Sequence, residues 1–172
     1  MRFMRNHKNI KTVPPEFSHL FDTQRLSPGG AEIHVKMEAS SVEREALAKR
    51  LGLLGINALT ALVRVRRMKG KNARLRVLGN LHADVVQSCV VSLNPVPEVV
   101  DEDFTIVFTD EPMEEAAGIS VDDDREPLDF VDGKLDLGEM VAQQLSLTLN
   151  PYPRDEDAVI NAEDAFLCLQ TE

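Results

Sequence analysis

Apolar and polar residues alternate through the middle of the chain, and this alternation predicts a set of β-strands. The stretch Gly79–Val96 shows it most plainly, because apolar side chains occupy every second position from Leu81 to Val85. A period of two is typical of a strand with one buried face. The apolar run Val90-Val91-Ser92-Leu93 extends the predicted strand as far as Asn94-Pro95, where we expect it to end.

The same alternation recurs on both sides of this stretch. It predicts further strands at residues 17–21, 33–38, 59–66, 74–77 and 104–109, and Leu128 with Phe130 indicates a short one. Ser27-Pro28-Gly29-Gly30 is typical of a turn, and residues 68–72 form a short loop. Strands 59–66 and 74–77, which this loop joins, are expected to pair as a hairpin.

Two segments follow the period of a helix. Ser40 with Glu43 three residues later predicts a capping box, and Gly52 or Gly55 ends the helix that it opens. Asp136 with Glu139 predicts the same start for a second helix, which Asn150-Pro151 ends. The apolar stripe of the first helix consists of Leu47, Leu51 and Leu54. The stripe of the second, expected to lie on the sheet, consists of Leu137, Met140, Val141, Leu145 and Leu149.

These elements predict an α+β fold: a mostly antiparallel, twisted sheet of five to seven strands with two packed helices. A sheet that curls into a partly closed barrel is a variant of this prediction. A length of 172 residues with 43% hydrophobic residues fits one domain. We expect a basic tail at residues 1–13, the domain at 14–153 and an acidic tail at 154–172.

No apolar run approaches the roughly 20 residues of a membrane helix. The basic start of the chain lacks the apolar stretch of a signal peptide. We therefore expect a cytoplasmic protein that does not bind a membrane.

Charge divides the chain into two parts of opposite sign. Residues 1–76 hold 16 Lys and Arg against 6 Asp and Glu, whereas residues 77–172 hold 3 against 23. The net charge of −10 conceals this division. Such asymmetry indicates a charged partner for one part of the chain.

The densest basic segment is the predicted hairpin at residues 64–76, which contains no acidic residue. Clustered cations of this kind suit the phosphate backbone of a nucleic acid, and the planar guanidinium of arginine suits it best. A solvated sheet face, neutralised by the acidic segments of the chain, is the alternative. The absence of an aromatic residue argues against stacking on single-stranded bases. The candidate nucleic-acid-binding residues are Arg64, Arg66, Arg67, Lys69, Lys71, Arg74 and Arg76, with Arg67, Lys69 and Lys71 expected at the tip.

The acidic segment 110–126 is expected to be an exposed loop, with the hypothesis that it shields the basic face until a partner displaces it. The triplets Asp101-Glu102-Asp103 and Asp122-Asp123-Asp124 lack the spacing of a calcium loop. We expect their side chains to be solvated.

No residue pattern predicts catalysis, a cofactor or a metal. The two cysteines, Cys89 and Cys168, stand far apart and match no metal-binding or disulfide spacing. A small buried side chain is the expected role of Cys89, with a reactive thiol left open. The four histidines, His7, His19, His34 and His82, are isolated from any catalytic partner in the sequence. We expect a protein that is not an enzyme.

Two motifs give the chain a resemblance to a known family. Cys89, followed by Ser92 and Leu93-Asn94-Pro95-Val96, forms the first motif, and residues 136–145 with 149–153 form the second. In this order they resemble the YceD family, the large ribosomal RNA subunit accumulation proteins of bacteria and plastids. The resemblance extends over roughly residues 17–153. In the family a second cysteine often stands where this chain has Ser92.

The resemblance implies a non-enzymatic role in the accumulation or assembly of large-subunit ribosomal RNA, with ribosomal RNA or its precursor as partner. The matching positions Cys89, Leu93, Pro95, Asp136, Gly138 and Glu139 are then structural. The alternative is a protein-binding adaptor whose acidic half engages a basic ribosomal protein. The oligomeric state stays open.

Overall fold

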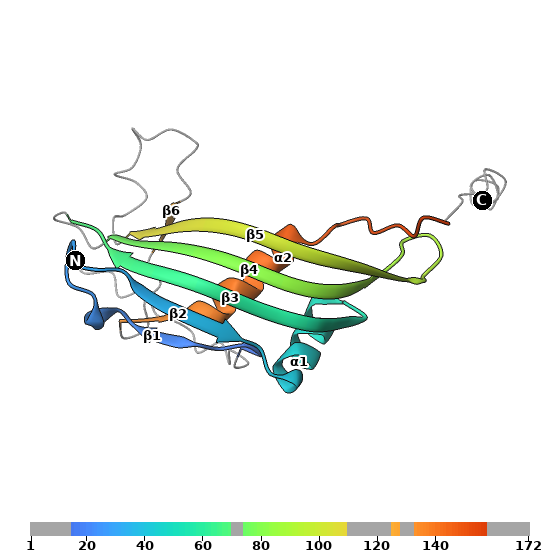
Figure 1. Cartoon of the computed structure of the whole chain (residues 1–172), viewed down its shortest axis with the longest axis horizontal. Coiled ribbons are helices and arrows are strands. Elements are labelled where there is room, and N and C mark those ends of the chain that lie inside the picture. Colours follow the sequence, from blue (N-terminus) through green and yellow to red (C-terminus); the bar gives the residue numbers. More distant parts are fainter. Residues whose placement is uncertain (1–14, 70–73, 110–124, 128–132, 158–172) are drawn as a thin grey trace, which may run out of the picture.

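The protein is an open five-stranded sheet with one long helix across one face (Figure 1). The structure is a computed structural model and describes residues 15–69, 74–109, 125–127 and 133–157. Its elements are β1 (Leu20–Asp22), a 3-10 turn (Thr23–Arg25), β2 (Ile33–Glu38), α1 (Ser41–Leu51), β3 (Gly55–Arg67), β4 (Arg74–Ser88), β5 (Pro95–Thr109), β6 (Arg125–Pro127), β7 (Lys134–Asp136) and α2 (Leu137–Thr148).

The main sheet has the strand order β2-β3-β4-β5-β6, and β1 pairs with β7 in a separate two-stranded sheet. All pairs are antiparallel except β5 with β6, which run parallel. The predicted α+β class is confirmed. The partly closed barrel is wrong, because neither sheet closes on itself among the described strands.

Strands β3 and β4 form the hairpin that their alternation predicts. Buried Val63 and Val65 pair with Gly79 and Val77, so one face of the hairpin belongs to the core. β4 is one continuous strand of 15 residues, which joins the predicted strand at 74–77 to the first part of the predicted strand that begins at Leu81. Gly79 allows this continuity inside the core, because the ring of Phe104 on β5 occupies the space where a side chain at position 79 would lie.

The predicted strand at Val90–Leu93 is wrong. β4 ends at Ser88, and the chain turns through residues 89–94 before β5. Hydrogen bonds close this turn: the Cys89 N–H donates to the Asn94 carbonyl over 2.8 Å, and the Leu93 N–H donates to the Cys89 carbonyl over 3.1 Å. Leu93 has a positive φ of 62°, a conformation outside the strand region.

The bounds of three other strands, β1, β5 and β6, also differ from the predictions. β1 begins at Leu20, three residues later than expected, although Phe17 is buried in the core. β5 begins at Pro95, nine residues before the predicted strand 104–109. The short strand β6 lies at Arg125–Pro127, which places the end of the predicted acidic loop 110–126 in the sheet. The rest of that loop and the strand predicted near Leu128 lie outside the described residues.

Both predicted helix starts are present, but the second differs in one bond. The Ser40 and Glu43 side chains form the complete capping box of α1, and Gly52 in the left-handed conformation ends the helix. The prediction was wrong for Leu54 in the apolar stripe of this helix, because Leu54 lies beyond the helix end and is 58% exposed. At α2, Asp136 accepts hydrogen bonds from the N–H groups of Gly138 and Glu139, while the Glu139 side chain turns away to Arg50.

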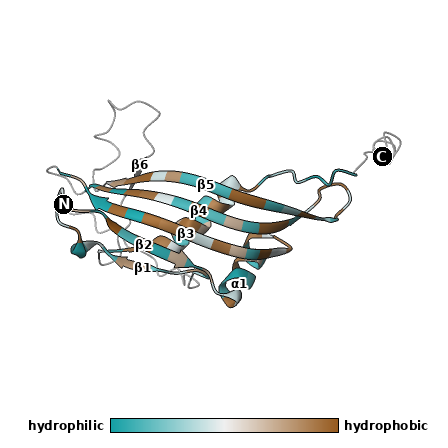
Figure 2. Cartoon of the chain, in the orientation of Figure 1, coloured by the Kyte–Doolittle hydropathy of each residue, from teal (hydrophilic) through white to brown (hydrophobic). Residues whose placement is uncertain are grey.

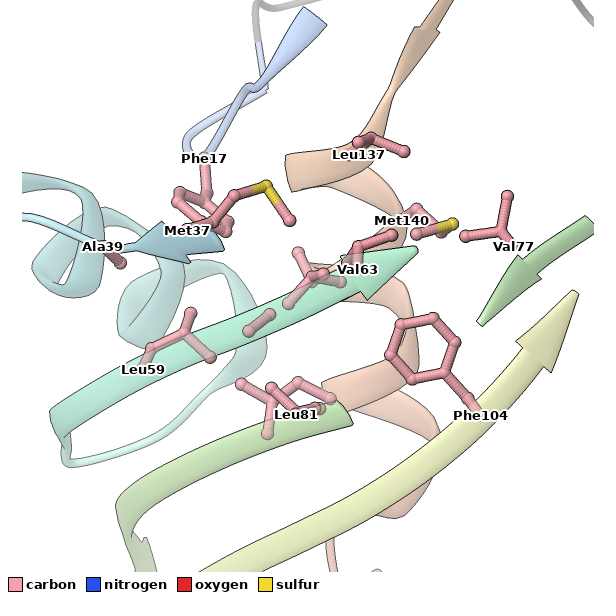
Figure 3. Packing of buried hydrophobic residues seen from close by; sticks show 14 of the residues in the cluster. Phe17, Met37, Ala39, Leu59, Val63, Val77, Leu81, Phe104, Leu137 and Met140 are labelled. Atoms are coloured by element: carbon pink, nitrogen blue, oxygen red, sulfur yellow. The ribbon is translucent and has the colours of Figure 1, made fainter. Parts of the chain in front are cut away.

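The core lies between α2 and one face of the main sheet (Figure 3). The predicted stripe of α2 is confirmed: its first four residues are buried, and Leu149 is half-buried. The predicted tails lie mostly outside the described residues. Within residues 154–157, the Asp155 side chain accepts a hydrogen bond from Asn94 in the β4–β5 turn.

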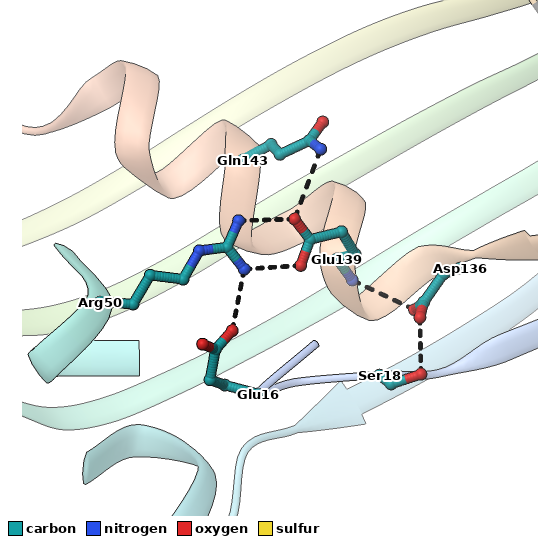
Figure 4. Close-up of polar contacts among 6 residues, drawn as sticks. All are labelled: Glu16, Ser18, Arg50, Asp136, Glu139 and Gln143. Atoms are coloured by element: carbon teal, nitrogen blue, oxygen red, sulfur yellow. Dashed lines mark hydrogen bonds and ion pairs between the residues drawn. The ribbon is translucent and has the colours of Figure 1, made fainter. Parts of the chain in front are cut away.

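The first turn of α2 fixes the helix to the rest of the protein (Figure 4). Arg50 at the end of α1 forms a bidentate ion pair with Glu139, with N–O distances of 2.6 and 2.8 Å, and a third bond of 3.0 Å to Glu16. These carboxylates raise the pKa of Arg50. Asp136 also accepts hydrogen bonds from the Ser18 hydroxyl and the His19 N–H. Three distant segments therefore meet at one helix end.

Gly138 packs directly against the backbone of the segment before β1. A Cβ at this position would lie 2.7 Å from the Phe17 carbonyl oxygen and 2.8 Å from the His19 nitrogen. We expect Gly138→Ala to lower the free energy of unfolding by about 1–3 kcal/mol, although alanine favours helices, because the segment at 17–19 must move away. Urea denaturation measures the change. The exposed Ser146→Ala on the same helix is the control and should lose nothing, and equal stability of the two variants would contradict this packing.

Candidate nucleic-acid interface

The sheet face opposite α2 carries no helix among the described residues, and its character follows from strand alternation. Arg64 and Arg66 on β3 alternate with buried valines, and Arg76 on β4 stands between buried Leu75 and Val77. All three arginines are exposed. They lie toward the end of the sheet where β3 and β4 join, with hydrophilic bands on both strands (Figure 2). If strands 59–66 and 74–77 pair, alternation predicts that Arg64, Arg66, Arg74 and Arg76 line one sheet face, and the structure places Arg64, Arg66 and Arg76 exposed on one face.

The register brings the arginines together with two residues of β2. Arg66 pairs directly with Arg76, and Arg64 pairs with Leu78 on one side and His34 on the other. Lys36 follows His34 by two positions on β2, and it is exposed on the same face. Like charges directly opposite in a sheet are destabilising. The face therefore carries a repulsive arginine pair that packing does not require.

No ion pair neutralises these side chains in the described part of the chain. Arg64, Arg66, Arg76 and Lys36 have no carboxylate partner there, whereas Arg50 has two. Their N–H donors are therefore open to a ligand. We call Lys36, Arg64, Arg66 and Arg76 the basic surface.

The other predicted residues do not belong to the basic surface. Arg67 pairs with buried Leu75, so it lies on the face opposite the basic surface and is half-buried. Arg74 stands two residues before Arg76 on β4 and so shares its face by alternation, but it is half-buried and has an interaction partner already. Lys69 is exposed, and its aliphatic carbons cover Gly29 of the predicted turn, whose N–H donates to the Arg67 carbonyl over 2.9 Å. Lys71 lies outside the described residues.

Lys36 is the member of this surface that sequence reasoning missed. Its alternation with Val35 and Met37 already indicated an outward side chain. Its position beside the arginines depends on the pairing of β2 with β3, which links residues about 30 positions apart.

Toward β5 the same face becomes acidic. Asp103 accepts a hydrogen bond of 3.0 Å from Asn80, Asp101 lies 2.7 Å from His82 Nδ1, and Asp84 accepts 3.2 Å from Asn57. His82 therefore has the partner that the sequence did not reveal, but both members of the pair are exposed. Polyanion binding would be confined to the end of the face that holds the basic surface, because the carboxylates repel phosphate.

The Cys89 sulfur is buried, as predicted, in the turn after β4, with 0% of the residue exposed. The N–H groups of Asp155, Ser92 and Val91 lie 3.4, 3.3 and 3.4 Å from it. Hydrogen bonds from the Asp155 N–H first, and then from Ser92, lower the pKa of Cys89 from 9.0 to about 6. The turn stabilises a thiolate.

In the described ranges, no helix has the length and apolarity needed to cross a membrane. No group of three or more His, Cys, Asp and Glu side chains gathers there in a way that could hold a metal ion.

The fold and the surface define an α+β protein with an open sheet, one face of which is charged and carries a basic surface without ion-pair partners among the described residues. The family model described as "Large ribosomal RNA subunit accumulation protein YceD" matches residues 77–172, more than half of the chain. The chain belongs to the YceD family. The match begins one residue after Arg76 and so includes none of the basic surface. Comparison with curated proteins and with solved structures gave no match.

Because the fold lowers the pKa of Cys89, we expect the free energy of unfolding to depend on pH. The pKa of Cys89 is lower in the folded protein than in the unfolded chain, so unfolding takes up a proton between about pH 6 and the ordinary thiol pKa of 9.0. This contribution is complete above the unfolded pKa and is lost as the pH falls through about 6. Urea denaturation of the Cys168→Ser variant, with and without Cys89→Ser, should show a stability difference that grows as pH rises. A difference constant with pH would contradict the thiolate.

Proposed function

We propose that this protein is a non-enzymatic, cytoplasmic factor that supports the accumulation of large-subunit ribosomal RNA, and that it contacts the RNA or its precursor particle through the basic surface. The observation that carries the proposal is the repulsive Arg66–Arg76 pair, with which no described carboxylate forms an ion pair. Glu32, directly before β2, lies 3.9 Å from His34 instead. A fold gains nothing from the arginine pair. A bound polyanion would offset the repulsion between the two guanidinium groups, because each group would be attracted to phosphate.

The chemistry of the surface favours the phosphate backbone over the bases. Arginine forks bind phosphate oxygens in bidentate geometry, and each neutralised phosphate releases counterions. Phe104 and Phe108, the aromatic residues of β5, are buried on the opposite face of the sheet. No aromatic side chain on the described strands therefore stands beside the arginines for base stacking. We expect binding with strong salt dependence and weak sequence preference.

The proposed absence of catalysis has support from the sequence, in which no nucleophile stands in a motif with a base. The His82–Asp101 pair lies on an open sheet face, with side chains 44% and 68% exposed. Acid–base chemistry in enzymes usually depends on a site that excludes water. This pair is solvated.

Charge reversal tests the proposed contact. We expect the triple variant Arg64→Glu, Arg66→Glu and Arg76→Glu to lose binding to large-subunit ribosomal RNA fragments. Because three phosphate contacts would be gone, the slope of log affinity against log salt should fall by about 2–3. Fluorescence anisotropy at several salt concentrations measures both quantities.

A matched control separates the surface from net charge. Arg25, Lys49 and Lys134 are exposed and lie outside the basic surface, so their reversal to Glu changes the net charge equally. This control should keep most of the affinity and salt slope. Equal losses in both triple variants would refute a local contact, as would full binding by the first.

A further inference from the structure

The outer edge of β5 is a second surface, at the opposite side of the sheet from β2 (Figure 1). β4 pairs with all fifteen residues of β5, whereas β6 pairs only with Val107–Thr109. From Pro95 to Ile106 the outer edge has no partner strand in the described part of the chain. An edge of this kind presents backbone N–H and C=O groups that a further strand could bind.

Two features bound the usable part of this edge. Pro95 and Pro97 have no N–H to donate, and prolines are typical of strand edges that are not meant to pair. At the other end β6 already occupies three residues, in parallel orientation. Between them lie nine residues, Glu98–Ile106, which we call the β5 edge. The pairing of β6 shows that the same side of β5 accepts a strand.

Carboxylates flank the β5 edge on both faces of the sheet. Asp101 and Asp103 pair with His82 and Asn80 on the face of the basic surface. Glu98 and Glu102 have the opposite parity, so they lie on the face of α2. No Lys or Arg stands between Pro95 and Thr109. Successive side chains of an added strand alternate between the faces, so its basic residues would meet a carboxylate on either side.

These charges select the occupant. Phosphate and acidic or neutral strands gain nothing beside four carboxylates, and a like-charged strand is repelled. Val99 adds an exposed apolar position, 63% exposed, next to the acidic residues. We propose that the β5 edge binds an extended segment of another protein, rich in lysine and arginine and containing valine-like residues, as an added strand.

This inference goes beyond the proposed function and does not depend on it. The basic surface lies on β2, β3 and β4, whereas the partner's backbone would bind only β5. It gives the acidic half of the chain a defined binding mode. A protein that holds RNA at one surface and a basic protein segment at the other would bring together two components that attract each other strongly.

The test uses the full chain and a labelled peptide of lysine, arginine, threonine and valine. A control peptide has the same charges with proline at alternate positions, so that it cannot pair as a strand. We expect the first peptide to bind with an affinity about tenfold higher than the second. Hydrogen exchange should slow for backbone N–H groups within Glu98–Ile106 when the first peptide is bound.

Neutral variants locate the site without changing its shape. Asp101→Asn, Glu102→Gln and Asp103→Asn together should weaken peptide binding about tenfold and leave RNA binding by the basic surface intact. The control, Glu45→Gln, Glu156→Gln and Asp157→Asn, removes three exposed charges elsewhere and should bind as the parent does. Circular dichroism confirms that both variants are folded.

Three results would overturn the inference. Equal affinity for the two peptides would show that charge alone attracts them to the protein, without strand pairing. Unchanged affinity of the Asp101–Asp103 variant would place binding elsewhere. A dimer of the chain in sedimentation equilibrium that protects Glu98–Ile106 without peptide would show that a second copy occupies the edge. Loss of RNA binding in the arginine variant would alter none of these outcomes.

Discussion

The packing of α2 on one face of the main sheet determines the rest of the structure. A single helix fills the inner face with Leu137, Met140, Val141 and Leu145, and its first turn is held by Asp136, Gly138 and Glu139. The segment before β1 and the end of α1 both contact this first turn, so three parts of the chain that are distant in sequence meet there. Since the other sheet face receives no helix in the described residues, its side chains are free of packing constraints.

That freedom explains where charge accumulates. The two halves of the sequence differ in sign, and the sheet converts this difference into separate surfaces. The basic surface lies where β3 and β4 join, while β5 carries the carboxylates along one edge. Asp101 and Asp103 bind His82 and Asn80, and none of the described carboxylates pairs with Arg64, Arg66 or Arg76. The chain therefore does not neutralise its own basic surface within the described residues.

Periodicity predicted the parts of the fold in which one physical effect dominates. Alternation along β3 and β4 gave the correct buried face, and the caps at Ser40 and Asp136 fixed both helix starts. Errors arose where two effects compete. The valines at 90 and 91 favour a strand, but hydrogen bonds to the Cys89 carbonyl and sulfur close a turn there. Pro95 and Pro97 obscured the start of β5, because an edge strand tolerates prolines that a central strand excludes.

The part of the candidate site that lies within single strands was predictable from the sequence, whereas the part that depends on strand pairing was not. Arg64, Arg66 and Arg76 follow from alternation within single strands. The position of Lys36 beside the arginines depends on the register between β2 and β3, which no local pattern encodes. Arg67 was expected at the tip, but β3 extends to it and alternation places it on the face of Val63 and Val65. The partner of Glu139 was likewise hidden, because Arg50 is 89 residues away in sequence. The family match, which starts at Val77, leaves the role of the arginines to experiment.

The most direct test of the account is sedimentation of cell extract on a sucrose gradient, with the protein and its arginine variant followed at low and moderate salt. We expect the protein to migrate with precursors of the large ribosomal subunit at low salt and to leave them as the salt concentration rises. The variant should remain near the top of the gradient in both conditions. Migration of the variant with the precursors at low salt, equal to that of the parent protein, would contradict the claim that the basic surface holds the protein there.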